Sequence, residues 1–148
     1  MSDTTSALTL QDLAKKIADI DFTMLSTRSI TGEIAARPMS NNGDVEYDGD
    51  SWFFTWEDSR MVDDIKRDAQ VGLSLQGKGG LLGKPPIFIA IEAKAELIRN
   101  KATFAEHWKP ELERWFKQGI DTPGIILIKA HAHRIHYWDG EEEGEVKV

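Results

Sequence analysis

Branched aliphatic residues at every second position of two neighbouring segments constrain the fold of this chain more than any other feature. Every second residue is apolar in residues 71–75 and again in residues 87–91. A period of two places the apolar side chains on one face of a β-strand, whereas a helix repeats every 3.6 residues. The glycine-rich segment 77–86 suits a hairpin connection between the two. We therefore expect an antiparallel sheet with one buried face.

Further strands are predicted on both sides of this hairpin, and few helices separate them. The strand-like segments are residues 21–27, 33–39, 51–56, 125–130 and 133–138. Helices are predicted over residues 10–20, 60–67 and 100–107, with a further helical piece over residues 110–116. Thr9 and Ser59 are the expected N-caps of the first two, although no Glu or Gln completes a capping box after Thr9. The pattern predicts a small, mainly β, α+β barrel.

Composition limits the chemistry that the chain can perform. A length of 148 residues suits one domain, and 25 acidic against 18 basic residues give a net charge of −7, which argues against a nucleic-acid partner. The absence of cysteine excludes disulfides, thiolate nucleophiles and iron–sulfur clusters. The N-terminus has no signal-peptide pattern, and the longest apolar run, residues 87–91, is too short to span a membrane. We expect one cytoplasmic domain over residues 1–148, with no membrane partner and with mobile ends at 1–8 and 140–148.

Two segments resemble ligand-binding loops but have the wrong spacing. Residues 79–84 are similar to a phosphate loop, yet Pro85 stands where Ser or Thr must contact magnesium. Residues 44–49 are similar to the start of a calcium loop, but its required Glu would fall at Thr55. We interpret both segments as ordinary loops.

The histidines near the C-terminus are candidate metal ligands. His131 and His133 share one face of a predicted strand, whereas His136 faces the other way. Two imidazoles without a third protein ligand make a poor catalytic metal site, so none is predicted. The acidic segment 141–145 is interpreted as a solvated end.

One combination of residues favours binding of a phosphate ester. Arg37 lies in a predicted strand, and Thr55, Ser59 and Arg60 lie where another strand leads into a helix. Free N–H groups at a helix N-terminus attract anions, and planar guanidinium groups match phosphate oxygens. The alternative is structural: Ser59 caps the helix, and the arginines pair with the carboxylates at 63–64.

At these residues the chain resembles a known family. The matching pieces are Ala-Arg-Pro-Met at 36–39, Trp-Phe-Phe-Thr at 52–55, Asp-Ser-Arg at 58–60, the Trp-Phe segment at 115–123 and Tyr-Trp-Asp at 137–139. They resemble the FMN-binding split barrels related to pyridoxamine 5′-phosphate oxidase, and within them the bacterial general stress protein 26 group. The resemblance covers about residues 10–139. It implies a six-stranded antiparallel split β-barrel with flanking helices, and a homodimer that holds FMN between its subunits.

The resemblance also implies roles for individual residues. Arg60 and Ser59 would grip the phosphate of FMN, and Arg37 would contact the phosphate or the ribityl chain. Phe54 and Thr55 would meet the edge of the flavin.

Three further residues would contact the isoalloxazine ring. Met39 would lie along it, Gln76 would make a polar contact, and Trp115 would cover it from the partner subunit. The chain departs from the group at Lys117, which replaces a proline, and in the length of the loop 77–86. It has no counterpart of the arginine–histidine pair that orients pyridoxamine phosphate, so vitamin B6 chemistry is not expected.

The implied function is that of an FMN-binding general stress protein. One hypothesis is a flavin-dependent oxidoreductase of unknown substrate, with NAD(P)H as a candidate electron donor, and a second is a non-catalytic sensor or store of FMN. The flavin carries the redox chemistry itself, so the lack of a protein nucleophile is compatible with both. A third hypothesis is haem binding, with His107, His131 or His133 as the axial ligand.

Overall fold

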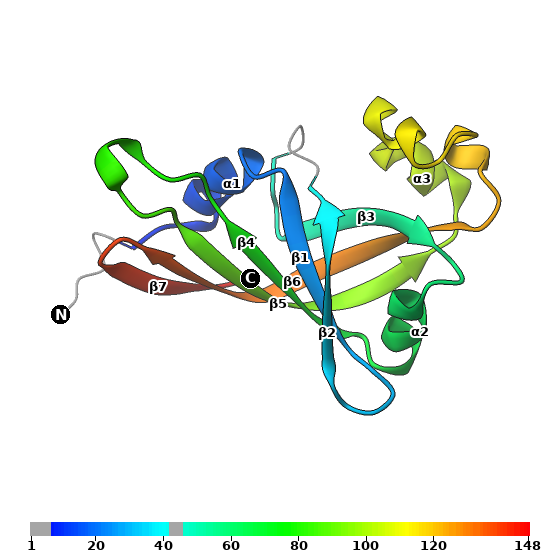
Figure 1. Ribbon diagram of the computed structural model, residues 1–148, viewed down its shortest axis with the longest axis horizontal. Coiled ribbons are helices and arrows are strands. Elements are labelled where there is room, and N and C mark those ends of the chain that lie inside the picture. Colours follow the sequence, from blue (N-terminus) through cyan, green and yellow to red (C-terminus); the bar gives the residue numbers. More distant parts are fainter. Residues whose placement is uncertain (1–6, 42–45) are drawn as a thin grey trace.

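The fold is a single antiparallel sheet that carries three α-helices at its margins. The computed structural model describes residues 7–41 and 46–148. The strands follow the order β2-β1-β4-β5-β6-β3, and β7 also pairs with β6 (Figure 1). The α-helices are α1 (Leu10–Ala18), α2 (Arg60–Arg67) and α3 (Lys101–His107), and the strands are β1 (Phe22–Arg28), β2 (Ile34–Ser40), β3 (Asp50–Trp56), β4 (Gln70–Gln76), β5 (Phe88–Ile98), β6 (Ile125–Asp139) and β7 (Glu142–Lys147).

The predicted fold class is confirmed, with two changes of detail. The protein is mainly β, every strand pair is antiparallel, and the sheet stays open between its two end strands, β2 and β3. The sheet has seven strands where the resemblance implied six. The segments 125–130 and 133–138, predicted as two strands, form the single strand β6. A register shift between Glu92 and Ala93 of β5 lets the long strands pair over their whole length.

The prediction of a mobile C-terminal end is wrong. Gly140 adopts φ +66°, which makes the tight turn that leads into β7. β7 then pairs with the second half of β6, along the edge whose first half pairs with β3. Gly144 lies against the ring of Tyr137, and a Cβ there would overlap that ring. The acidic segment is therefore a seventh strand, because β6 offers it an unpaired edge.

The N-terminal end is fixed where the structure describes it. The first six residues of the predicted mobile end lie outside the described residues, but the Leu8 N–H donates a 2.8 Å hydrogen bond to the Tyr137 hydroxyl. The Thr9 side chain accepts from the Asp12 N–H, and the Asp12 carboxylate accepts from the Thr9 N–H. This capping box uses Asp in the place of Glu, so the expectation that Thr9 has no capping box is wrong. It fixes the start of α1, and the Thr9 hydrogen bonds lower the pKa of Asp12.

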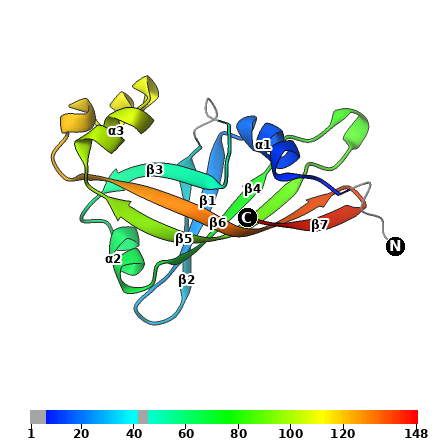
Figure 2. The same ribbon diagram turned by 180° about the vertical axis from the view of Figure 1, so that it is seen from behind.

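The buried residues form two separate hydrophobic clusters. The larger one, here called the barrel core, lies within the curved sheet and is covered by α1 through Leu13, Ala14 and Ile17. The smaller one, here called the aromatic cluster, joins β3, β5 and β6 to α3 and the short helices η3 (Pro110–Arg114) and η4 (Gly119–Asp121). Figures 1 and 2 both show α3 at the end of the molecule away from α1.

Strand β3 is the wall that the two clusters share. Its side chains alternate, so that Phe53 enters the barrel core while Trp52 and Phe54 pack on the aromatic cluster. β6 alternates in the same way, with Ile128 in the barrel core and Leu127 in the aromatic cluster. No helix in the described ranges has the length and apolarity that a membrane span requires.

Candidate functional site: an aromatic cavity at the open side of the sheet

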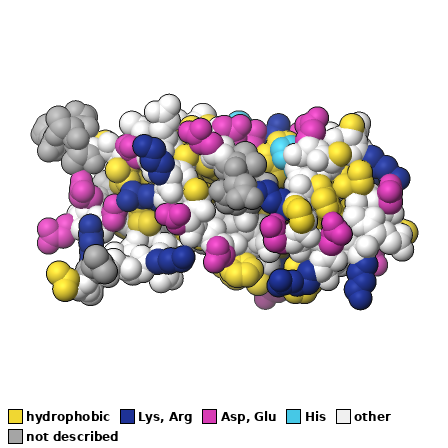
Figure 3. Space-filling view, turned by 90° about the horizontal axis from the view of Figure 1, so that it is seen from above, with side chains coloured by type: hydrophobic (Ala, Val, Ile, Leu, Met, Phe, Trp, Pro, Cys, Tyr) yellow, Lys and Arg dark blue, Asp and Glu magenta, His cyan; other side chains and the backbone are white. Residues whose placement is uncertain are grey.

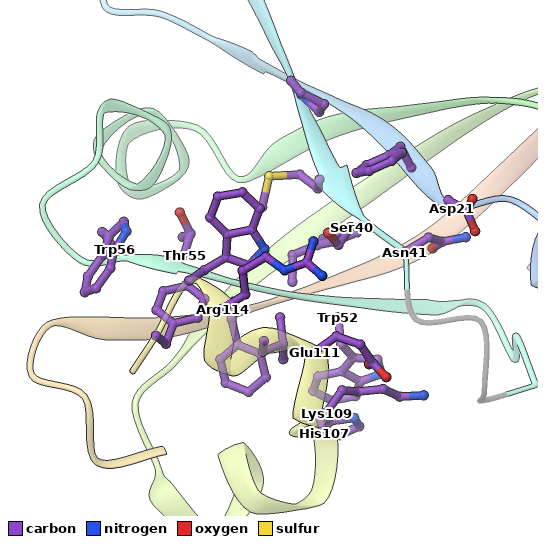
Figure 4. Close-up of a pocket in the computed structure, with 18 of the residues that line it drawn as sticks. Asp21, Ser40, Asn41, Trp52, Thr55, Trp56, His107, Lys109, Glu111 and Arg114 are labelled. Atoms are coloured by element: carbon purple, nitrogen blue, oxygen red, sulfur yellow. The ribbon is translucent and has the colours of Figure 1, made fainter. Parts of the chain in front are cut away.

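A cavity lies where the sheet remains open. It has a volume of about 850 Å³ and is bounded by β2, β3 and the segment from α3 to η3. Cavities of this size hold small organic ligands and cofactors. Figure 4 shows side chains from all three elements converging on it. The lining residues are Ala18, Asp21, Phe22, Pro38–Asn41, Trp52–Trp56, His107, Lys109, Glu111, Leu112 and Arg114–Phe116.

Aromatic rings make up much of the cavity wall. Trp52 stacks on His107, with ring centroids 3.6 Å apart and planes 16° from parallel. The Lys129 ammonium also lies over the Trp52 ring, 5.4 Å from its centroid. Burial lowers the pKa of His107, since it opposes the charged form more than nearby carboxylates favour it. Trp115 leaves 63% of its surface exposed, so its ring is available to cover a ligand.

Polar groups occupy the rim of the cavity. The Asn41 side-chain amide donates to the Ile17 and Ile20 carbonyl oxygens at the end of α1, which fixes that side chain at the cavity edge. Arg114 projects from η3 across the cavity in Figure 4. Within the described residues its guanidinium makes no hydrogen bond or ion pair, so it is the least restrained cation of the cavity wall.

A second polar feature lies where β1, β2 and α2 meet. It is here called the arginine cluster, and it consists of Arg37, Arg60 and Arg67 around Asp64, together with Thr27 and Ser59. Arg37 Nη1 donates to the Thr27 hydroxyl at 2.8 Å and to the carbonyl oxygens of Ala35 and Leu25. Its Nη2 lies 3.8 Å from the Asp64 carboxylate. Arg37 is half-buried, and burial and the neighbouring Arg60 lower its pKa while Asp64 raises it. Arg37 therefore pairs with a carboxylate of α2, which is the structural role predicted as the alternative to phosphate binding.

Asp64 is the buried centre of the arginine cluster. Its side chain is 2% exposed, and its two oxygens accept hydrogen bonds from Thr27 and Arg67 at 2.8 and 2.9 Å. Burial alone would raise the pKa of Asp64, but these hydrogen bonds and the positive charges of Arg67 and Arg60 reverse that effect and lower it. Arg37, Arg60 and Arg67 thus surround the carboxylate of Asp64. These four side chains together carry a net positive charge.

The N-terminus of α2 adjoins the arginine cluster. Ser59 caps the helix by accepting the Val62 N–H at 3.2 Å, as predicted. Arg60 is exposed and is the first residue of the helix. Free N–H groups at a helix end and an exposed guanidinium are groups that favour an anion, and the exposed side of the cluster holds both.

The structure divides the eight residues assigned from the resemblance into three groups. Met39, Phe54, Thr55 and Trp115 line the cavity. Arg37, Ser59 and Arg60 belong to the arginine cluster, which lies beyond the cavity along β2 and β3. Gln76 lies apart from both, at the exposed end of β4 opposite Phe88 of β5.

Sequence reasoning did not assign Trp52, Lys109 or Arg114 to the site, and it named His107 only as a candidate haem ligand. Trp52 and His107 meet across 55 positions of the chain, and no local pattern reports such a contact. Lys109 precedes η3 and Arg114 ends it; a helical piece was predicted over residues 110–116, but nothing in its spacing indicated which side would face a cavity. Their nearness to the aromatic Trp-Phe pair at 115–116 is the one signal that could have suggested a ligand-facing segment.

The C-terminal histidines have carboxylate partners in the structure. His131 Nδ1 lies 2.6 Å from Asp50, and His136 Nε2 lies 2.7 Å from Glu143 of β7. In the part of the chain that the structure describes, no three His, Asp or Glu side chains are grouped closely enough to hold a metal ion.

The open antiparallel sheet, with an aromatic cavity at its split, defines a split barrel. Residues 9–148 match the family described as pyridoxamine 5′-phosphate oxidase like, and the chain belongs to that family. This confirms the resemblance inferred from the sequence. A comparison with proteins of curated function gives no match.

Solved structures with the same fold come from several bacteria. A Clostridium acetobutylicum protein related to general stress protein 26 of B. subtilis superposes with a TM-score of 0.77 at 18% identity, over 94% of each chain. The general stress FMN/FAD binding protein of Xanthomonas citri gives 0.69 at 22% identity, over 90% of each chain. A haem binding protein of Mycobacterium smegmatis gives 0.74 at 13% identity, over 95% of this chain and 58% of the other. At these identities the likeness establishes the fold.

Proposed function

We propose that this protein binds FMN, with the isoalloxazine ring in the aromatic cavity and the phosphate at the arginine cluster. One observation carries the proposal: Met39 lines the cavity, and Arg37 lies two residues away on the same face of β2. A ligand that has a flat apolar ring at one end and an anion at the other matches this order of surfaces. The Xanthomonas citri relative, an FMN/FAD binding protein of the same fold, supports the choice of flavin.

The arginine cluster suits a phosphate monoester. Arg37, Arg60 and Arg67 surround the single carboxylate of Asp64, so an added dianion would balance the positive excess. Burial and the charge of Arg60 both oppose the charged form of Arg37, and an anion between the two arginines would relieve that repulsion. Ser59 and the first N–H groups of α2 supply neutral donors beside them.

The aromatic cavity suits the flavin ring. Phe54 and Trp115 offer flat apolar surface, and Met39 offers a polarizable side chain. The Thr55 hydroxyl lies on the same wall and can hydrogen-bond the polar edge of the ring. When bound, FMN would supply hydride or electron transfer, while these residues bind the ring, orient it and limit its contact with water.

A homodimer is part of this proposal. The outer face of the sheet exposes Phe22 and Met24 of β1, Phe88 of β5 and Trp138 of β6, and Phe88 and Trp138 are directly paired across the strands. Exposed apolar surface of this kind is typical of a protein interface. Hydrophobic side chains also gather toward the α3 end of the face seen in Figure 3. A second subunit on these surfaces would cover the exposed Trp115 and complete the cavity.

The redox role proposed for the protein is that of a flavin-dependent oxidoreductase in a cytoplasmic stress response, with NAD(P)H as the electron donor to be tested first. A flavin sensor or store would use the same binding residues. NAD(P)H oxidation by the FMN-loaded protein separates the two roles, because a sensor or store would show no turnover.

Haem is the second candidate ligand, and His107 favours it. His107 lines the cavity and stacks on Trp52, and burial lowers its pKa, which favours the neutral form that an axial ligand requires. His131 lies on the sheet beside Asp50, outside the cavity, so His107 is the stronger of the histidines considered. The haem binding protein of Mycobacterium smegmatis shares the fold.

An absorption spectrum distinguishes the two ligands. Purified protein is mixed separately with excess FMN and with excess haemin, gel-filtered, and scanned from the ultraviolet to the red. We expect a structured flavin band at about one FMN per chain and no Soret band. A Soret band that disappears in His107→Ala, with no retained flavin, would instead establish the haem alternative.

A further inference from the structure

A polar network with a buried centre lies beside the proposed phosphate site. Asp64 and Thr27 are each 2% exposed, and they belong to α2 and β1. The Thr27 hydroxyl donates to Asp64 Oδ2, and the Arg67 guanidinium donates to Asp64 Oδ1. The chain of contacts continues to Arg37 on β2, so three elements of the fold meet in it.

The direction of each hydrogen bond in the network is determined. Thr27 has one hydroxyl proton, and because carboxylates only accept, that proton goes to Asp64. The lone pairs of the hydroxyl are then left to accept from Arg37 Nη1, 2.8 Å away. Thr27 therefore acts as a relay that needs both a donor and an acceptor function, and valine, which has the same shape, has neither.

The network forms hydrogen bonds with one edge of the Arg37 guanidinium and forms none with the other edge. Nη1 is held by three oxygen acceptors, those of Thr27, Leu25 and Ala35. Nη2 is within ion-pair distance of Asp64 but beyond hydrogen-bond distance, at 3.8 Å. The Nε–H and Nη2–H donors thus make no hydrogen bond within the described residues, and they form the fork that binds two oxygens of a phosphate at once.

We propose that Thr27 and Asp64 are positioning residues for anion binding: they fix Arg37 by its Nη1 edge so that its Nε–Nη2 fork is presented to the phosphate. This inference rests on the proposed function, because it assigns the anion to the phosphate of FMN. The gain from such a relay is pre-organisation. A long arginine side chain already fixed in its binding geometry loses less conformational entropy when the ligand arrives.

A comparison of FMN with riboflavin tests the proposal, since riboflavin lacks only the phosphate. Dissociation constants for both are measured by flavin fluorescence in the wild type and in Thr27→Val. We expect Thr27→Val to weaken FMN binding about 10-fold and to leave riboflavin binding unchanged, so that the preference for FMN falls by the same factor. Thr27→Ser, which keeps the hydroxyl, is expected to retain the preference.

Thr23→Val is the matched control. Thr23 is buried on the same face of β1, and in the described part of the chain it shares no hydrogen bond with Arg37 or Asp64. The flavin affinities of Thr23→Val show how much the removal of a buried hydroxyl from β1 changes binding when Arg37 is not involved. If Thr27→Val weakens both flavins equally, or matches Thr23→Val, the positioning role is wrong and Thr27 is only structural.

Asp64→Asn separates positioning from charge neutralisation and serves if Thr27→Val fails to fold. The single amide oxygen can accept from only one of Thr27 and Arg67, so the network loses an acceptor, while the net positive charge near the phosphate rises. Positioning predicts a weaker preference for FMN, and simple neutralisation of Arg37 predicts a stronger one, which would overturn the inference. A wild type that binds riboflavin as tightly as FMN would contradict the proposed phosphate site itself, and that result is distinct from any failure of the variants.

Discussion

The two hydrophobic clusters of the protein differ in composition and in what they support. The barrel core is built mainly from Ile, Leu, Val and Ala, and it lies inside the sheet beneath α1. The aromatic cluster has few fully buried members, and its partly buried ones include Trp52, Phe54 and Trp108. Edge-to-face contacts join its rings, such as Phe54 with Trp108 at 5.0 Å. The fold therefore depends on one cluster, and the proposed ligand cavity depends on the other.

This division separates the residues that build the core of the sheet from those that surround the cavity. β3 presents Phe53 to the barrel core and Phe54 to the aromatic cluster, so each side can change without the other. The arginine cluster is a third region, fixed by hydrogen bonds among β1, β2 and α2. Variants in each region should therefore have separable effects on stability and on flavin binding.

The largest effect is expected in the barrel core. Leu73→Ala removes a fully buried side chain, and we expect the free energy of unfolding to fall by about 2–5 kcal/mol. Thermal and urea unfolding measure this loss. FMN affinity of the folded variant should equal that of the wild type, because Leu73 is not among the residues that line the cavity.

Leu112→Ala is the matched substitution in the aromatic cluster. Leu112 is partly buried and lines the cavity. We expect a loss of about 1 kcal/mol in stability together with weaker FMN binding. If Leu73→Ala weakened FMN binding more than Leu112→Ala did, the two clusters would not be energetically separate.

The next effect concerns the arginine cluster. Arg60→Ala should weaken FMN binding about 10- to 100-fold, because a charge-assisted hydrogen bond contributes about 1.5–3 kcal/mol. Stability should be unchanged, since Arg60 is exposed. Calorimetric titration gives the affinity, and Lys66→Ala is the control, because Lys66 is a cation of the same helix that pairs with Glu57. Equal affinity in Arg60→Ala and the wild type would remove Arg60 from the site.

A smaller effect is expected in acid. The pKa of Asp64 is lowered in the folded protein, so the stability from its ionised form is complete above its ordinary pKa of 3.8 and is lost as the pH falls through the lower folded value. The free energy of unfolding should fall between about pH 5 and about pH 2. Asp64→Asn should be less stable near neutral pH and should lack this part of the acid dependence. An identical pH profile in both proteins would contradict the assigned pairing.

The smallest effect is expected at the cavity rim. Trp115→Ala should weaken FMN binding only about two- to five-fold, because the indole is largely exposed in a single subunit. Iodide should quench the bound flavin more strongly in this variant. Unchanged quenching would show that Trp115 does not cover the ring.

The parts of the fold that the sequence predicted were those with local signals. Period-two alternation located β4 and β5, and the cap residues Ser59 and Asn100 located the starts of α2 and α3. β7 was missed because glutamates and a glycine have little strand propensity, and only the free edge of β6 makes them a strand. The site was predicted in part for the same reason: Arg37 and Arg60 stand beside recognisable local motifs, whereas the Trp52–His107 stack is a purely tertiary contact.

The central claim is that the cavity and the arginine cluster together bind one molecule, the ring in the first and the phosphate in the second. The most direct test is calorimetric titration of the wild-type protein with FMN and with riboflavin under identical conditions. The account predicts that both bind and that FMN binds about 10- to 100-fold more tightly. Equal affinities, or no binding of either flavin, would contradict it.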